Sequence, residues 1–165
     1  MKILLAIDGS EASREAVRFV AEMLAGSRVQ ASVTLYHVIE TLPEYLLSRG
    51  RDAVAGAAYR QLIDDLTASR RAEGERLLAE HQQTLLAAGG PAQALHRKLE
   101  IRDALPEARK VAAAMAIIEE MKSGDYSVVC LGRRGTASAE GSFLGSVAEK
   151  VLREARGRTA WVVDR

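Results

Sequence analysis

The sequence is poor in the residues that several protein classes require. It has one cysteine, Cys130, among 165 residues, which excludes an internal disulfide framework and a cluster of thiolate metal ligands. Because Cys130 lies within the apolar run 128–131, we expect a buried, unreactive thiol rather than a nucleophile. The 3 histidines lie on different predicted elements without metal-ligand spacing, so we predict no metal site built from them.

An excess of charge and a long apolar run are also missing. With 23 basic and 22 acidic side chains, the formal net charge is +1, which favours neither a nucleic-acid-binding surface nor a polybasic membrane anchor. The apolar run at residues 3–7 ends at Asp8 and is too short for a signal peptide or a membrane span, and no other run reaches spanning length. We therefore expect a cytoplasmic protein without nucleic-acid or membrane partners.

Hydrophobic residues make up 48% of the chain, which is enough to predict one packed domain over residues 1–165. Residues 2–7 form a nearly continuous apolar run, typical of a strand buried on both faces. The next segment has helical spacing, with Ser10 as its N-cap and Gly26 as its stop. Further strands are expected at residues 31–39, 94–101, 126–131 and 159–163, and further helices at 58–88, 106–124 and 144–155.

Strands and helices alternate in this prediction, apart from one segment. Between residues 41 and 57, Pro43, Gly50 and Gly56 interrupt the pattern and indicate a mobile, partly helical excursion. The alternation predicts an α/β fold, a Rossmann-like five-stranded parallel sheet with helices on both faces. Such sheets bind ligands at the carboxyl ends of strands, near the point where the strand order reverses. Asp8 and Gly132 both lie at carboxyl ends.

The segment after the fourth predicted strand is rich in glycine. Gly132 and Gly135 are separated by two residues, nine residues follow, and the next pair is Gly145 and Ser146, which opens a predicted helix. Glycine lets backbone N–H groups approach phosphate oxygens, and the free N–H groups at a helix start form an anion site. The segment 132–146 is therefore predicted to bind phosphate groups, the alternative being glycines that only shape a long turn. It is neither a Walker A loop nor the dinucleotide pattern Gly-x-Gly-x-x-Gly.

At these positions the chain resembles the universal stress protein family, whose ATP-binding members have glycine, two residues, glycine, nine residues, glycine, and serine or threonine. The resemblance extends to residues 3–10 and 36–39 and covers most of the chain outside 42–59. It implies ATP as the ligand, with ADP or AMP as alternatives, and Mg²⁺ carried by the nucleotide. The residues that it places at the nucleotide are Asp8, Val38, Leu131, Gly132, Arg133, Gly135, Gly145, Ser146 and Val147.

The resemblance also implies individual roles. Asp8 would lie beside the adenosine, near any Mg²⁺, and Val38 would contact the adenine. The glycines and Ser146 would hold the phosphates, while Leu131 and Val147 would complete the wall of the pocket.

Two features depart from the family pattern. Residues 101–106 lack the glycine turn that usually follows the third strand, so we expect the ribose side to be built differently. Arg133 and Arg134 stand where small or polar residues are common, and they either strengthen phosphate binding or face solvent. Glu149, three residues after Ser146, is interpreted as a capping-box residue rather than a catalytic carboxylate.

The resemblance predicts an ATP-binding stress-response protein that acts as a nucleotide-responsive regulatory or protective dimer, paired through residues 159–164, which include Trp161. Replacing Gly132 by valine is expected to abolish stabilisation by ATP. A slow ATPase or nucleotide switch is the first alternative, although no convincing catalytic base is visible. A nucleotide-independent structural dimer is the second.

Overall fold

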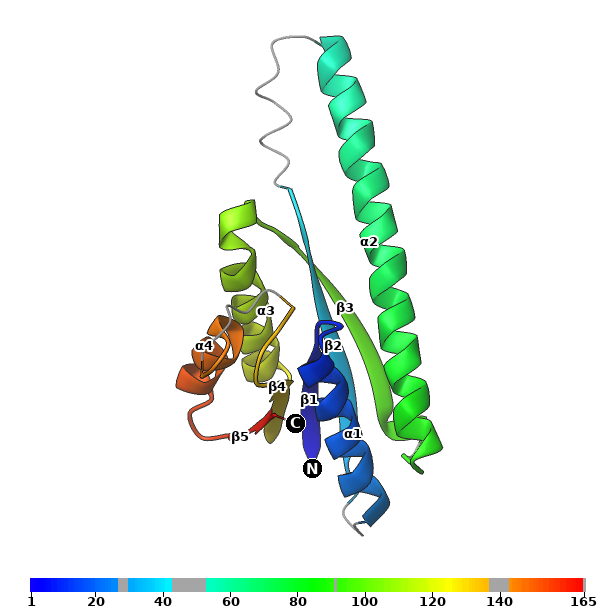
Figure 1. The fold of residues 1–165 in the computed structure, drawn as a ribbon, viewed down its shortest axis with the longest axis vertical. Helices are drawn as coiled ribbons and strands as arrows, with labels where there is room; N and C mark the ends of the chain where they lie inside the picture. Colours follow the sequence, from blue (N-terminus) through cyan, green and yellow to red (C-terminus); the bar gives the residue numbers. More distant parts are fainter. Residues whose placement is uncertain (27–29, 43–52, 91, 137–142, 165) are drawn as a thin grey trace.

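The computed structural model describes residues 1–26, 30–42, 53–90, 92–136 and 143–164. Its described strands form one parallel sheet with the order β3-β2-β1-β4-β5 (Figure 1). The α/β fold expected from the sequence is thereby confirmed. The strands are β1 (Lys2–Ile7), β2 (Ser32–Thr41), β3 (Leu95–Asp103), β4 (Val128–Gly132) and β5 (Thr159–Val163).

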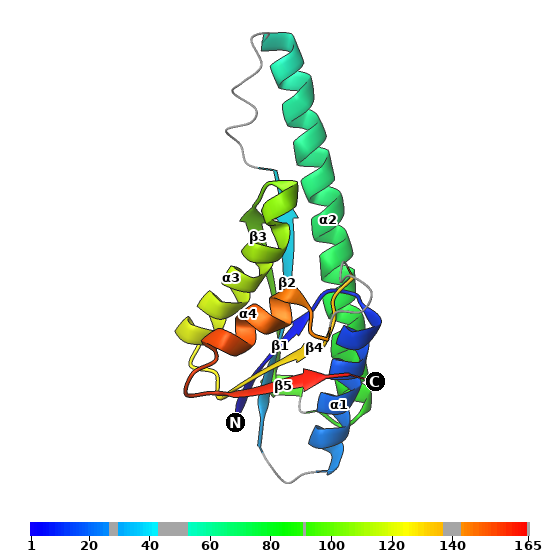
Figure 2. The same ribbon diagram turned by 60° about the vertical axis from the view of Figure 1, so that its left-hand side comes forward.

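Helices cover both faces of the sheet, as Figures 1 and 2 show. Helices α1 (Glu11–Gly26) and α2 (Ala53–Ala87) pack on one face. Helices α3 (Arg109–Ser123) and α4 (Ser146–Glu154) pack on the other. Two short 3-10 helices, η2 (Ala92–Ala94) and η3 (Pro106–Ala108), precede β3 and α3.

Alternate residues of the central strand enter the two layers. Ile3 and Leu5 pack toward α1 and α2, whereas Leu4 and Ala6 pack toward α3 and α4. This two-sided burial explains why the strand is an unbroken apolar run rather than an alternating one. Cys130 lies in the core between the sheet and helices α1 and α2, with no exposed surface, and burial raises the pKa of its thiol to about 12. The expected burial of the thiol is confirmed, and the raised pKa disfavours the nucleophilic thiolate.

The expected helix starts are confirmed at α1 and revised at α2. The backbone N–H of Ser13 donates to Ser10 Oγ at 3.1 Å, which is the expected N-cap. Helix α2 begins at Ala53 instead of residue 58, so the end of the expected excursion is helical, while residues 43–52 lie outside the described part of the chain.

Gly74, in the middle of α2, lies where that helix meets the sheet. A Cβ atom on Gly74 would lie 2.8 Å from Leu99 Cδ1 and 2.9 Å from His37 Cδ2. Only a residue without a side chain allows this approach, so the cost of glycine to the helix is offset by close packing.

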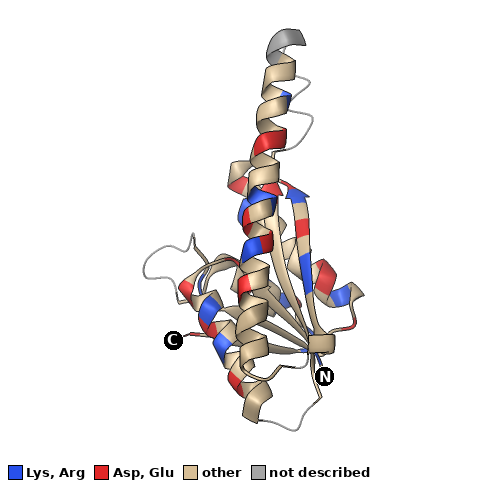
Figure 3. Ribbon diagram, turned by 90° about the vertical axis from the view of Figure 1, so that its right-hand side faces the viewer, with Lys and Arg blue, Asp and Glu red and all other residues tan. Residues whose placement is uncertain are grey.

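The first part of α2 projects beyond the sheet (Figures 1 and 3). A guanidinium nitrogen of Arg70 donates to the carbonyl of Glu40, near the end of β2. Before that point, Tyr59, Leu62 and Leu66 are exposed, Leu62 by 60%. Although α2 has 35 residues, neither it nor any other described helix is long and apolar enough to cross a membrane.

Candidate functional site

A cavity of about 360 Å³ opens at the carboxyl ends of β1 and β4. The chain leaves β1 toward β2 and β3 and then returns to β4 on the other side of β1, so the strand order reverses between these two strands. The connections after them lead to α1 and α4 on opposite faces, which separates their backbones and creates a crevice. The volume is typical of a small-molecule site.

All nine residues that the family resemblance placed at a nucleotide line this cavity. They come from the ends of three strands, from the glycine segment and from the start of α4. Their assembly from segments far apart in the sequence follows from the parallel sheet, whose carboxyl ends share one edge. Their contact with a nucleotide stays a prediction.

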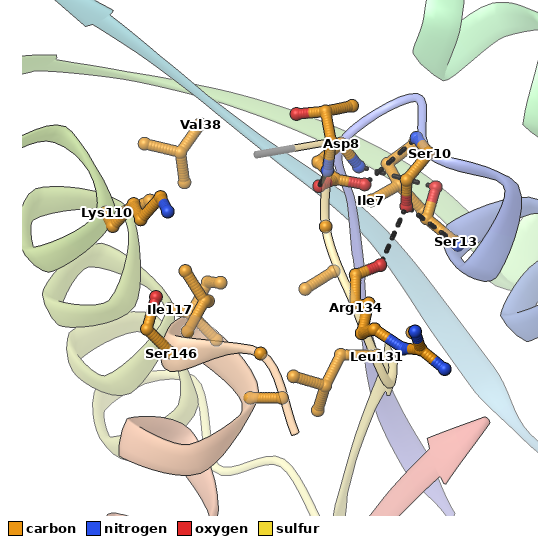
Figure 4. Close-up of a pocket in the computed structure, with 18 of the residues that line it drawn as sticks. Ile7, Asp8, Ser10, Ser13, Val38, Lys110, Ile117, Leu131, Arg134 and Ser146 are labelled. Carbon is orange, nitrogen blue, oxygen red and sulfur yellow. Dashed lines mark hydrogen bonds between the residues drawn. The ribbon is translucent and has the colours of Figure 1, made fainter. Parts of the chain in front are cut away.

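The carboxylate of Asp8 ties the end of β1 to the glycine segment. Its Oδ1 accepts the backbone N–H of Ser10 at 3.1 Å, and its Oδ2 accepts the backbone N–H of Thr136 at 3.1 Å. A Cβ atom on Gly135 would come within 2.5 Å of Asp8 Oδ2. The glycine at position 135 therefore lets the segment lie against this carboxylate (Figure 4).

Gly132 has a different neighbour. A Cβ atom on it would lie 2.6 Å from the carbonyl carbon of Ala12 and 2.8 Å from the Ala12 Cβ. The end of β4 thus packs against the first turn of α1, and Ser10 Oγ adds a hydrogen bond to the Arg134 carbonyl at 3.3 Å. At Gly132 the reason for glycine is packing between elements, whatever else this residue does.

The backbone of Arg133 links the two ends of the glycine segment to each other and to β5. Its N–H donates to the Val163 carbonyl at 2.7 Å, and its carbonyl accepts the N–H of Gly145 at 2.9 Å. These two bonds hold the end of β5 and the start of α4 beside β4. The geometry of this part of the cavity is therefore determined by backbone contacts.

The Arg133 side chain is engaged outside the cavity. Its guanidinium donates to the Asp164 carboxylate and to the Phe143 carbonyl, and it lies 4.7 Å from the centroid of the Phe143 ring. The guanidinium of Arg134 points away from the centre of the cavity (Figure 4). The alternatives that the sequence left open for these two arginines, phosphate binding or plain solvent exposure, omitted the ion pair with Asp164.

Helix α4 starts at the cavity with Gly145 in an extended conformation, φ −68° and ψ 146°, and with no side-chain cap. The first N–H groups of the helix form its positive end at this edge of the cavity. Glu149 instead accepts from Arg153 at 2.5 Å. The interpretation of Glu149 as the capping-box partner of Ser146 is wrong, because the N-cap of α4 is Gly145 and the Glu149 carboxylate pairs with Arg153.

Apart from Val38, the sequence missed the side of the cavity formed by β2 and α3. Tyr36, His37 and Glu40 line it from β2, and Arg109, Lys110 and Ile117 line it from α3. A signal was present, because the helix that follows a parallel strand begins at the carboxyl edge of the sheet. The first turn of α3 should therefore have been considered together with the loops after β1 and β4. Residues 101–106, by contrast, do not line the cavity.

Two titratable groups on this side are shifted by burial. Burial raises the pKa of the Glu40 carboxyl, and the positive charge of Arg109 acts in the opposite direction. Burial also raises the pKa of the Tyr36 hydroxyl, which donates to the Ala116 carbonyl at 3.3 Å. Within the described residues, no cluster of three or more His, Cys, Asp or Glu side chains is arranged to hold a metal ion.

Comparison with known proteins agrees with the fold. The model of the universal stress protein family matches residues 1–159, whereas no curated protein sequence gives a significant match. The solved structure of universal stress protein UspA from Lactobacillus plantarum is 19% identical, with a TM-score of 0.75, and the match covers 99% of this chain and 97% of that one.

Two further solved structures contain nucleotides. A universal stress protein in complex with cAMP is 17% identical, with a TM-score of 0.59 and coverage of 99% of this chain and 96% of its own. The universal stress protein from Archaeoglobus fulgidus in complex with dAMP is 18% identical, with a TM-score of 0.57 and coverage of 99% and 98%. At these identities the likeness shows a shared fold.

Proposed function

The chain belongs to the universal stress protein family, and on that premise we propose that it binds ATP in the cavity at the ends of β1 and β4 and acts as a nucleotide-responsive regulatory or protective protein. The observation that carries this proposal is the convergence of all nine expected residues on one cavity beside the start of α4. In this proposal residues 1–165 work as one nucleotide-binding domain.

The two sides of the cavity fit the two parts of an adenine nucleotide. Apolar side chains from three elements, Val38, Ile117 and Leu131, face the space where an adenine ring would lie (Figure 4). The positive end of α4, with the Ser146 hydroxyl, faces the position of the phosphates. ADP and AMP carry the same adenine and would make the same apolar contacts, so the phosphate contacts determine which of the three nucleotides binds most tightly.

In this proposal Asp8 orders the glycine segment and also contacts any Mg²⁺ that the nucleotide carries. The Asp8 carboxylate already accepts two backbone N–H groups and therefore orders the glycine segment before any ligand arrives. Mg²⁺ binds proteins through one or two carboxylates together with the phosphates of a nucleotide, and Asp8 is the carboxylate beside the glycine segment. The ion would thus come with the nucleotide and supply charge neutralisation there.

Dimerisation through β5 is the second part of the proposal. In the sheet order β5 is an edge strand. Two backbone bonds point from it toward β4: the Thr159 N–H donates to the Ser127 carbonyl, and the Val163 carbonyl accepts from Arg133. Because backbone groups alternate in direction along a strand, those of Ala160 and Val162 point to the open edge. A second β5 could pair there and cover the edge.

The test is the nucleotide content and the ligand response of the purified protein. Mass spectrometry of denatured protein should detect ATP or ADP, and added ATP at 100 times its Kd should stabilise the fold by about 2.7 kcal/mol, a rise in melting temperature of roughly 5–10 °C. Gly135→Ala should reduce both effects. Gly26→Ala is the matched control, since a Cβ atom at Gly26 meets no atom of the described residues within 4 Å.

The same measurements separate the alternatives. Release of ADP with steady conversion of added ATP would support a slow ATPase. If the parent protein releases no nucleotide and ATP leaves its melting temperature unchanged, the proposal fails and the nucleotide-independent dimer takes its place.

A further inference from the structure

We propose that Glu40 from β2 and Arg109 from α3 together recognise the edge of the adenine base. The Glu40 carboxylate accepts a hydrogen bond from the exocyclic amine, and the Arg109 guanidinium donates to a ring nitrogen beside that amine. The inference rests on the proposed function and deepens it, because it makes the site prefer adenine over hypoxanthine. Neither residue is among the nine that the family resemblance placed at the nucleotide.

Strand β2 and helix α3 each line the cavity with one row of side chains. Every second residue of a strand points to the same face, and residues four apart on a helix lie on one face. The row on β2 consists of Tyr36, Val38 and Glu40, and the row on α3 consists of Arg109, Ala113 and Ile117. Tyr36, Val38 and Ile117 also belong to the core between the sheet and α3, so the two rows face each other.

Contacts at both ends show how the two rows are aligned. At the inner end, the Tyr36 hydroxyl donates to the carbonyl of Ala116, the neighbour of Ile117, at 3.3 Å. At the outer end, the positive charge of Arg109 acts on the Glu40 carboxylate. This wall of the cavity is therefore apolar in its middle and charged at its outer end.

The arrangement suits a base with apolar faces and a polar edge. Two residues of a strand advance by about 6.6 Å, so an adenine ring against Val38 has one edge within reach of the Glu40 side chain. The amine of adenine is a donor with an acceptor nitrogen on each side. A carboxylate beside a guanidinium offers an acceptor beside a donor and matches this pattern. In hypoxanthine an oxygen replaces the amine and would face the carboxylate as a second acceptor.

The hydrogen bonding of the two side chains agrees with a ligand contact. The Glu40 carboxylate accepts its own backbone N–H, whereas Arg109 acts on it through charge. The Nε of Arg109 is buried and has no hydrogen-bond partner among the described residues, although buried donors are usually paired. A ring edge can therefore bind both groups and give the guanidinium an acceptor.

The experiment is isothermal titration of the full chain with three nucleotides: ATP, purine riboside triphosphate, which lacks only the amine, and ITP, which contains hypoxanthine. In the parent, loss of the amine should lower the affinity about ten- to hundredfold, the range for a hydrogen bond to a charged group. ITP should bind no better. In Glu40→Met, ATP should bind as weakly as purine riboside triphosphate. Glu40→Gln retains a carbonyl acceptor and should keep part of the preference for ATP.

Glu100→Met is the matched control for the change in charge. Glu100 lies beside Val38 on the neighbouring strand β3 and pairs with Arg102 at 2.9 Å, but it does not line the cavity. This variant should bind the three nucleotides as the parent does. The same loss of ATP affinity here would assign the effect to net charge and overturn the proposal.

Two further analogues test Arg109. 1-Deaza-ATP and 7-deaza-ATP each lack one of the ring nitrogens beside the amine. The parent should bind one of them more weakly than ATP, and Arg109→Met should remove that difference. A difference that persists in Arg109→Met would overturn the Arg109 contact, and so would equal binding of ATP and both analogues by the parent.

The remaining outcomes are decisive as well. Equal losses for ATP and purine riboside triphosphate in Glu40→Met would mean that Glu40 only joins β2 to α3, which overturns the proposal. A parent that binds these two nucleotides equally, or that prefers ITP, would overturn it and leave a nucleotide site in place. If the parent binds none of the compounds, the proposed function fails and this inference fails with it.

Discussion

Gly132 contacts Ala12 so closely that a Cβ atom on Gly132 would lie 2.6 Å from the Ala12 carbonyl carbon. The carboxyl end of β4 is thereby fixed against the first turn of α1. The contact changes what a substitution at Gly132 measures. Gly132→Val, which the sequence favoured as a test of nucleotide binding, would push two backbones apart and damage the fold before any ligand is added.

The two glycines at the start of the glycine segment should therefore respond differently to alanine. Gly132→Ala meets backbone atoms and should lower the free energy of unfolding by about 1–3 kcal/mol. Gly135→Ala meets the exposed Asp8 carboxylate, which can rotate away, so its cost should stay below about 1 kcal/mol while nucleotide binding weakens. Urea denaturation of both ligand-free variants checks this. Equal losses of stability would contradict the assignment of Gly132 to packing and Gly135 to the site.

A second pair of glycines lies on α2. Alanine is favoured over glycine in a helix by about 0.8–1 kcal/mol. Gly56→Ala should realise up to this gain, because no atom in the described part of the chain lies within 4 Å of its new Cβ. Gly74→Ala should instead destabilise by about 1–3 kcal/mol, because its Cβ would collide with Leu99 and with the His37 ring, which is held by the Ile7 carbonyl at 2.8 Å.

Thermal unfolding of the two α2 variants provides the measurement. The melting temperature should rise in Gly56→Ala and fall in Gly74→Ala. Helix propensity alone would raise it in both variants. A rise in melting temperature for Gly74→Ala would mean that α2 does not approach the sheet as closely as the structure shows.

His81 on α2 should make stability depend on pH. It is 3% exposed, its Nε2 has no partner among the described residues, and burial lowers the pKa of its imidazole below 6.5. Arg14 and His37 lower this pKa further, whereas Glu80 acts in the opposite direction. The unfolded chain therefore takes up a proton at higher pH than the folded chain, and the stability present above pH 6.5 is lost as the pH falls toward the lowered pKa.

The free energy of unfolding, measured at intervals between pH 7.5 and 5, tests this dependence. The parent should lose stability below about pH 6.5, and His81→Leu should show a flatter profile over the same range. Parallel profiles would assign the slope to other groups.

The open edge of β5 gives a test of the proposed dimer. Ala160→Pro removes one N–H that points away from β4 and leaves the bonds of Thr159 and Val163 in place. Sedimentation of the parent should show a dimer whose dissociation constant rises at least tenfold in this variant, with the circular dichroism spectrum unchanged. A dimer that tolerates Ala160→Pro would have to use another surface.

Much of the fold was encoded locally. The run at residues 2–7 and the segment 159–163 have the same bounds in the structure as in the sequence prediction. For β1 the reason is that a strand buried on both faces leaves a continuous apolar run that needs no knowledge of its partners. The helix stop at Gly124 was equally readable, and its N–H donates to the Glu120 carbonyl as expected of a helix end. The start of α2 was misplaced because Gly56 looked like an interruption, yet it lies inside the helix.

By itself the sequence determined the order of strands and helices, the glycine segment at the end of β4, and the identity of one side of the cavity. Tertiary structure alone decided that the Arg133 side chain pairs with Asp164, that Gly132 lies against Ala12, and that Lys110 and Ser146 line the same cavity. Periodicity and turn chemistry act between near neighbours and so are visible in a linear sequence. Contacts between segments tens of residues apart depend on how the sheet orders its strands and how the helices pack on it.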